Sequence, residues 1–291
     1  MIVPSWESKL TQSTHNDNKA ARRTGLQNVG AFGNALSVCT LALYFRMFED
    51  YPMIVAANRD EHYDRSSAPP AISDAKPRII AGTDLRAGGT WLGVNECGLI
   101  AGILNRRLDG RQLPANDRRS RGLLCMDLLK QNSTASAKSF IDGHAARYNP
   151  FTVVYGDKSE ISVSYNSDEK IITQSLQPGL HVFSSAAEFD LHSVKAERAY
   201  SLFHQLSTRI QPLRGQLSEP IAALQSVLAD HTLGAHSTDP GDAICVHRET
   251  SGTVSASVIF FSQAESCFET FYCSGPPCRN SFGGALQLDV R

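Results

Sequence analysis

Two short apolar runs near the start of the chain, residues 39–45 and 53–57, are separated by a polar turn. Apolar runs of this length that are bounded by turn residues predict two paired antiparallel β-strands. Cys39 begins the first run, and the polar cluster Asn58-Arg59-Asp60-Glu61 ends the second. Because a hairpin places the start of one strand beside the end of the next, we expect the Cys39 thiol to meet this cluster at one edge of a sheet.

The rest of the pattern predicts alternating groups of strands and helices. A polar, proline-containing segment at residues 66–77 is typical of a surface loop, and Gly98 supplies the positive φ that a hairpin turn needs. Further strands are predicted at residues 90–94, 99–104, 151–155, 161–165, 171–174, 180–184, 243–247, 254–261 and 268–272. Helices are predicted at residues 121–131, 135–148, 193–206 and 219–230. This order indicates an α+β fold in which helices pack outside antiparallel sheets.

Residues 1–38 have a different composition, rich in Ser, Thr, Asn and Gln and without a clear apolar period. We expect them to be disordered or loosely attached to a single domain at residues 39–291. A secretory signal peptide is disfavoured because no apolar segment follows Arg22-Arg23, whereas the scarcity of acidic residues leaves an organelle-targeting peptide open. A further hypothesis is that the extension is mis-assigned and that Val38 marks a GUG start codon. Removal of the initiator methionine would then leave Cys39 at the amino terminus.

Composition narrows the function classes. The 291 residues are 42% hydrophobic and 20% charged, with a net charge of -1, which gives no general reason to expect a nucleic acid as partner. No apolar run approaches the ~18 residues that span a bilayer, so we expect no integral membrane segment. The seven cysteines are irregularly spaced and favour a reducing, cytoplasmic location. Cys273 and Cys278 have no second cysteine pair nearby, and the sequence predicts neither a metal nor a cofactor.

Asn58-Arg59-Asp60-Glu61 resembles the signature of the NRDE family, which includes the transport-and-Golgi-organisation proteins. The resemblance extends roughly from Cys39 to the C-terminus. It implies the four-layer αββα fold of N-terminal-nucleophile hydrolases, with which the predicted elements are compatible. The other matching motifs are Gly88-Gly89-Thr90-Trp91-Leu92-Gly93, Gly252-Thr253-Val254-Ser255-Ala256-Ser257 and Gly275-Pro276-Pro277-Cys278.

A more distant similarity is to conjugated bile acid hydrolases and penicillin V acylases, which share that fold class. Their Cys-Thr start resembles Cys39-Thr40, and their Asn-Glu-x-Gly-Leu resembles residues 95–99, which Asn105 follows. The resemblance implies that Cys39 is the nucleophile and that the Asn105 amide stabilises charge on a carbonyl oxygen. A cysteine with a free α-amine carries its own base, since that amine titrates near ~8.

The Arg-Asn-x-Asp motif of those hydrolases matches only in part. Asn58 and Asp60 align with its Asn and Asp, but Ala57 occupies the arginine position. Along a strand, Asn58 and Asp60 share one face and Arg59 lies on the other, unless a bulge brings both faces together. We therefore expect Asp60 to hold the α-ammonium and Arg59, if it reaches, to favour the thiolate. A second oxyanion-hole asparagine of those enzymes falls near Ser184-Ser185, where neither residue is an amide.

The candidate catalytic residues are therefore Cys39, Asp60, Arg59 and Asn105, and the candidate substrate-binding residues are Asn58, Trp91 and Ser185. Each has a structural alternative. Cys39 could be a small buried hydrophobe, Arg59 and Asp60 an ion pair, Asn105 a turn residue, and Trp91 a sheet-packing residue.

Three functions follow from these residues. The first is a hydrolase of a small-molecule amide or acyl thioester that uses Cys39. The alternative is a non-catalytic binding or trafficking protein for haem or lipid, as the family resemblance allows, so the sequence leaves enzymatic activity open. A redox-responsive role for Cys273 and Cys278 ranks last. The oligomeric state is not predicted.

Overall fold

The computed structural model describes residues 39–106, 118–166, 170–185, 193–211, 215–233 and 237–291. The predicted extension at residues 1–38, with its targeting and start-codon hypotheses, lies outside the described residues. Among the described residues, no helix is long and apolar enough to cross a membrane.

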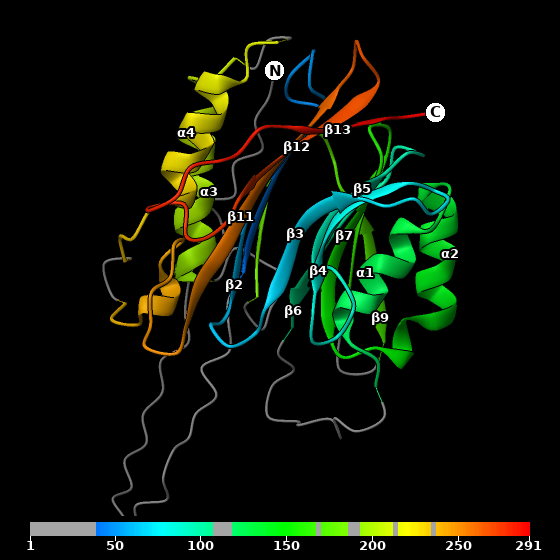
Figure 1. Cartoon of the computed structure of the whole chain (residues 1–291), viewed down its shortest axis with the longest axis horizontal. Helices are drawn as coiled ribbons and strands as arrows, with labels where there is room; N and C mark the ends of the chain where they lie inside the picture. The colour runs from blue at the N-terminus through cyan, green and yellow to red at the C-terminus, as the bar shows by residue number, and fades with distance from the viewer. Residues whose placement is uncertain (1–38, 107–117, 167–169, 186–192, 212–214, 234–236) are drawn as a thin grey trace, which may run out of the picture. The chain divides into compact units, whose positions relative to one another are not determined.

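Two antiparallel sheets form the centre of the described domain (Figure 1). The first has the strand order β10-β1-β2-β11-β12-β13, and the second runs β3-β4-β5-β6-β7-β8-β9. In chain order, the strands of the first sheet are β1 (Thr40–Phe45), β2 (Met53–His62), β10 (Gly179–Ser184), β11 (Ser251–Ser262), β12 (Cys267–Cys273) and β13 (Leu286–Asp289). Those of the second are β3 (Ser67–Ile72), β4 (Ile79–Asp84), β5 (Leu92–Asn95), β6 (Ile100–Asn105), β7 (Phe151–Gly156), β8 (Ile161–Asn166) and β9 (Ile171–Ser175).

Helices cover the outer face of each sheet. Helices α3 (Val194–Ser207) and α4 (Ser218–Leu228) lie on the first sheet, and α1 (Arg121–Leu129) and α2 (Thr134–His144) lie on the second. Short 3₁₀ turns occur at η2 (Ala145–Arg147) and η3 (Pro240–Asp242). The layers therefore follow the order helix, sheet, sheet, helix, which confirms the predicted αββα arrangement.

The alternation of side chains along β1 and β2 builds two of the three apolar cores. Leu41, Leu43 and Val55 point toward the second sheet and form the core between the sheets. Tyr44 and Ile54 point the other way and pack under α3 and α4. Both strands are buried on both faces, and this explains why their sequences read as continuous apolar runs.

The structure corrects the sequence prediction at four places. Residues 66–77 were predicted to form a loop but contain β3, which includes Pro69-Pro70. Prolines are tolerated there because β3 is an edge strand and because its pairing with β4 is interrupted by a register shift between Ala68 and Ala71. The prediction also missed β4 and β13.

The fourth place is residues 243–247, where the predicted strand was wrong. Residues 243–246 are buried, but the segment forms no regular strand and has only an isolated bridge between His247 and Gly252. Its N–H groups bond to other partners: Cys245 N donates to Asp230 O at 2.9 Å, and Val246 N donates to Thr253 Oγ1 at 2.8 Å.

A close approach of two backbones fixes α1 against the start of β5. Thr90 N donates to Gly122 O at 3.0 Å, and a Cβ on Gly89 would overlap the Gly122 backbone. Gly122 lies in the first turn of α1, next to Arg121. Position 89 therefore admits only glycine while α1 keeps this place.

Replacing Gly89 with alanine should push α1 away and destabilise the fold by about 1–3 kcal/mol. The matched control is Gly143→Ala in α2, where a Cβ meets nothing within 4 Å. This change should be neutral or stabilising by up to about 1 kcal/mol, because alanine favours a helix. Urea unfolding midpoints compare the two variants, and equal midpoints would contradict the close approach.

Candidate functional site

The pairing of β1 with β2 brings Cys39 to the polar cluster. The register joins Thr40 to Asn58, so Cys39 lies opposite Arg59 at the end of the strand pair. The Cys39 thiol lies 3.5 Å from the backbone carbonyl oxygen of Asp60, to which it donates. The predicted meeting of the thiol with the Asn-Arg-Asp-Glu cluster is confirmed.

Asp60 is held by a buried ion pair. Its Oδ2 accepts a hydrogen bond from Lys195 Nζ at 2.8 Å, and its Oδ1 accepts one from Thr253 Oγ1 at 2.6 Å. Both charged side chains are only 1% exposed. Burial raises the pKa of the Asp60 carboxyl, while the Lys195 ammonium and the Thr253 hydroxyl act in the opposite direction. The carboxylate is therefore fixed in position and shielded from water.

Arg59 lies on the other face of β2, as the alternation predicted. Its guanidinium stacks over the Trp91 ring at 4.6 Å and approaches Glu61 Oε2 at 3.7 Å. In the neighbouring strand β11, the register shifts between Thr253 and Ser255. This shift marks a bulge in β11, the strand beside Arg59 and Asp60. Both residues line the same pocket.

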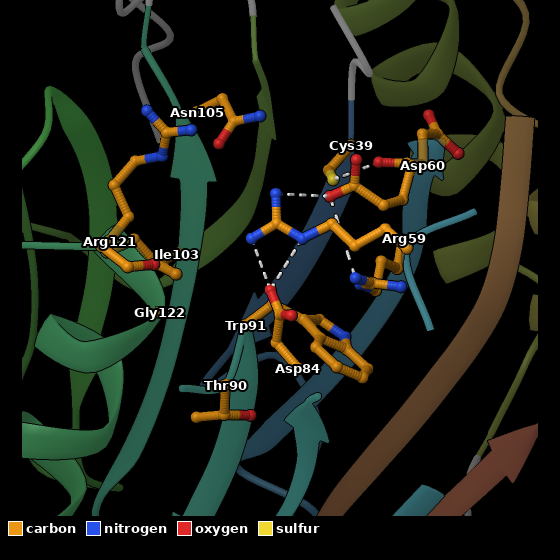
Figure 2. A pocket seen from close by; sticks show the side chains of 13 residues that line it. Cys39, Arg59, Asp60, Asp84, Thr90, Trp91, Ile103, Asn105, Arg121 and Gly122 are labelled. Atoms are coloured by element: carbon orange, nitrogen blue, oxygen red, sulfur yellow. Dashed lines mark hydrogen bonds and ion pairs between the residues drawn. The ribbon is translucent and has the colours of Figure 1, made fainter. Parts of the chain in front are cut away.

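This pocket opens beside the Cys39 thiol and encloses about 540 Å³, part of it open to solvent. The space inside it that a water-sized sphere can reach is about 70 Å³, which is smaller than the roughly 300–1,000 Å³ of typical small-molecule sites. Figure 2 shows Cys39 and Asp60 on one side of the pocket, with Asn105 and Arg121 on the other. The complete lining consists of Cys39, Arg59, Asp60, Glu61, Arg65, Asp84, Thr90, Trp91, Ile103, Asn105, Ser120, Arg121 and Gly122.

Asn105 ends β6, which places its side chain at the rim of the second sheet, across the pocket from the thiol (Figure 2). Within the described ranges, its side-chain amide makes no hydrogen bond. An amide that is partly buried and faces a pocket without a partner has a donor to offer a ligand.

The other two candidate substrate-binding residues lie outside the pocket lining. Asn58 points toward the helix layer, where its Nδ2 donates to Leu228 O at 2.8 Å and to Ile244 O at 2.9 Å. Ser185 lies beside Cys39, since Ser185 N donates to Cys39 O at 3.3 Å, but its hydroxyl is buried. The structure therefore does not bring either side chain to the pocket.

The thiol is poorly ionised while residue 39 stays inside the chain. Burial, reinforced by the Asp60 carboxylate, raises the pKa of Cys39 to about 11. The nearby cations Lys195 and Arg59 offset only part of this shift. Because the thiolate is the nucleophilic form, Cys39 needs a base to react at neutral pH.

Sequence reasoning missed three residues around the site. Lys195 carried a signal, because it is a charge on the buried stripe of α3 that also contains Ala199 and Phe203. Thr253 comes from β11, far along the chain. Arg121 lines the pocket and donates to Pro150 O at 3.3 Å, and burial lowers the pKa of its guanidinium. Only the fold could place Thr253 and Arg121 here.

Replacing Lys195 with methionine should destabilise the protein by about 3–5 kcal/mol at neutral pH, because it leaves a buried carboxylate without its counter-ion. The same change raises the pKa of the Asp60 carboxyl in the folded protein further. In the unfolded chain this carboxyl loses its proton above pH ~4, whereas in the folded variant it keeps the proton to a higher pH. Stability then rises as pH falls toward ~4, and the deficit relative to wild type should shrink.

Urea unfolding of both proteins between pH 4 and 8 measures this deficit. The control is Lys130→Met, which removes an exposed pair with Asp127 and should cost under about 1 kcal/mol at every pH. A deficit for Lys195→Met that is small or grows on acidification would show that the pair does not hold Asp60 as described.

A penicillin V acylase from Agrobacterium tumefaciens has a similar fold, with a TM-score of 0.54 and 15% identity over 81% of this chain and 83% of that chain. At this identity the likeness shows the fold alone. The described domain therefore has the αββα architecture of N-terminal-nucleophile hydrolases.

Among curated relatives, the chain is 33% identical over 146 residues to Transport and Golgi organization 2 homolog of Mus musculus. It is 30% identical over 146 residues to the Homo sapiens homolog. Each match covers 47% of this chain and 51% of the relative, so the chain spans about half the length of the curated relatives it matches. The family model Transport and Golgi organisation 2 matches residues 38–271. The chain belongs to the Transport and Golgi organisation 2 family.

Proposed function

We propose that the protein hydrolyses a small-molecule amide or acyl thioester, with Cys39 as nucleophile once its α-amine is free. The observation that carries this proposal is the Cys39 thiol at the start of β1, 3.5 Å from the Asp60 carbonyl oxygen, in a pocket that Asn105 faces from the other side. The αββα fold supports it, because enzymes of this architecture use the first residue of the mature chain as nucleophile.

The reaction follows from the groups around the thiol. The α-amine accepts the thiol proton while sulfur bonds to the substrate carbonyl carbon, and Asn105 donates to the resulting oxyanion. The α-ammonium then gives its proton to the departing amine or thiol, which leaves an acyl thioester on Cys39. Water attacks that thioester with the amine as base, so the carboxylic acid departs and the thiol is restored.

Asp60 would position the α-ammonium. Each of its carboxylate oxygens accepts one hydrogen bond, from Lys195 or Thr253, and keeps a second lone pair for another donor. Because this carboxylate cannot rotate without breaking both bonds, it gives the amine a fixed partner. Asn58 acts indirectly, by anchoring β2 to the segments at Leu228 and Ile244.

The charges of the pocket favour a substrate with a polar or anionic portion. Arg65 pairs with Asp84, with Nε 2.9 Å from Oδ2, whereas Arg121 makes no ion pair within 4.0 Å among the described residues. A guanidinium without a carboxylate partner can bind a substrate carboxylate or phosphate by donating hydrogen bonds to it. Trp91 and Ile103 add apolar surface for the acyl side.

The direct test frees the amine after folding. Residues 35–38 are replaced by Ile-Glu-Gly-Arg, and the folded chain is cleaved with factor Xa so that Cys39 becomes terminal. Hydrolysis of fluorogenic fatty amides and acyl-coenzyme A is measured before and after cleavage. We expect kcat/KM to rise roughly 10²–10⁴-fold, the usual contribution of a positioned base.

Cys39→Ala in the same cleavable chain is the control and should show no rise. Asn105→Leu should lower kcat by roughly 10²–10³-fold with little change in KM, because the amide acts on the transition state. Equal turnover by the cleaved wild type and Cys39→Ala would refute a hydrolase. Tight binding of haem or lipid that survives Cys39→Ala without turnover would indicate a carrier instead.

Alkylation by iodoacetamide reports on the thiol itself. With a pKa of about 11, Cys39 in the intact chain should react roughly tenfold faster per pH unit from pH 7 to 10. Cleavage should raise the rate at pH 7 and move the inflection toward the amine pKa near ~8. Peptide mass mapping follows Cys39, with half-exposed Cys97 as reference. An identical pH profile before and after cleavage would contradict the amine's role as base.

A further inference from the structure

A second cluster of reactive side chains lies outside the pocket lining. It consists of His231, Cys245, His247 and Cys278, and one ligand atom from each lies within 4.8 Å of all the others. His247 Nε2 is 3.3 Å from Cys278 Sγ and 3.8 Å from Cys245 Sγ. The His231 and His247 rings are 4.9 Å apart, centroid to centroid. Four potential donors therefore converge on one point.

The orientation of His231 suits a ligand. Its Nδ1 lies 3.0 Å from the backbone carbonyl oxygen of Cys245. A carbonyl oxygen only accepts, so Nδ1 carries the proton and Nε2 keeps its lone pair. A hydrogen bond of this kind, from the far ring nitrogen to a backbone carbonyl, is typical of histidines that bind metals.

Hydrogen bonds that do not involve the four donor atoms hold the segments together. Asp230 O accepts from Cys245 N at 2.9 Å, which joins the segment after α4 to residues 245–247. Gln225 of α4 donates to Pro277 O and Asn280 O, each at 2.9 Å, which joins α4 to the turn that carries Cys278. The donors are thus brought together by the fold itself, and such preorganisation favours metal binding.

We propose that His231, Cys245, His247 and Cys278 form a structural zinc site. Structural Zn²⁺ binds four Cys and His side chains in a tetrahedron, and two thiolates with two imidazoles are one of its usual ligand sets, with Zn–S about 2.3 Å and Zn–N about 2.0–2.1 Å. Those bond lengths place neighbouring donor atoms roughly 3.3–3.8 Å apart. The two distances from His247 match this spacing, and the other pairs of donor atoms, which lie within 4.8 Å, need to close by at most about 1.5 Å. Four protein ligands leave no open position, so the metal has a structural role.

The sequence predicted no metal because the four ligands form no motif of closely spaced pairs. Cys245 and His247 are two residues apart, but His231 and Cys278 join them only through the fold. The site also explains why the buried segment at residues 243–247 has a fixed path without being a strand. Val246 N donates to Thr253 Oγ1, which in turn donates to Asp60 Oδ1. By fixing the residues on either side of Val246, zinc would stabilise the hydrogen bonds that hold Asp60.

The test uses the full, untagged chain, since an affinity tag of histidines would itself bind zinc. Protein produced with added zinc and dialysed against metal-free buffer is assayed by mass spectrometry for metals. We expect about one zinc per chain. Replacement by Co²⁺ should give tetrahedral ligand-field bands and thiolate-to-cobalt charge transfer.

His231→Ala and Cys278→Ser should each raise the zinc Kd at least roughly 100-fold. Loss of a group that only hydrogen-bonds a metal ligand weakens metal binding by roughly 10–100-fold, and loss of the ligand itself should weaken it more. The matched controls are His204→Ala in α3 and Cys97→Ser, which lie outside the cluster and should keep the wild-type Kd. His231 is exposed, so its variant should fold and decides the test if Cys278→Ser does not.

The proposal is overturned by absence of zinc after dialysis, by an unchanged Kd in His231→Ala, or by a cobalt spectrum without thiolate bands. A disulfide between Cys245 and Cys278 in protein purified anaerobically with zinc would overturn it as well. None of these outcomes depends on hydrolytic activity.

Discussion

The register of β1 against β2 determines how the whole domain is arranged. With Thr40 opposite Asn58, one face of both strands fills the space between the sheets and the other supports α3 and α4. A slip of one residue would exchange the two faces and bury Arg59 under the helices. The same register places Cys39 at the pocket, so the constraint that builds the cores also builds the candidate site.

The buried pair of Asp60 and Lys195 is the costly part of this arrangement. Two charges removed from water are rarely a source of stability, but removal of one partner is strongly destabilising. The pair joins α3 to β2, close enough to Cys39 that both charges act on the pKa of its thiol. Thr253 adds a link from Asp60 to β11 and, through Val246, to the proposed zinc ligands. One network of polar contacts thus supports both proposed sites.

Much of the fold could be predicted from the sequence where one local signal dominated. The hairpin at residues 39–57 and the helix at residues 193–206 have strong apolar patterns, and the structure confirms them. β3 was hidden because Pro69-Pro70 is a loop signal unless the strand is known to be an edge. Residues 243–247 were mistaken for a strand because burial produces the same apolar run whatever the hydrogen-bonding partners are.

The residues of the candidate site likewise fall into those that the sequence could indicate and those that only the fold could place. Cys39, Arg59, Asp60, Trp91 and Asn105 were found because they lie in short motifs, and they do line one pocket. Lys195, Thr253, Arg121 and the zinc ligands come from distant segments that only tertiary structure brings together. Asn58 was assigned to the substrate from its motif, but its amide anchors the helix layer instead.

The proposed hydrolysis requires that the nucleophile and its base belong to one terminal residue. The intact mass of the protein isolated from cells that express its native gene shows where the mature chain begins. We expect a mass that corresponds to a chain beginning at Cys39. A mature protein that retains any residue before Cys39 would leave the thiol without its amine and rule out this mechanism.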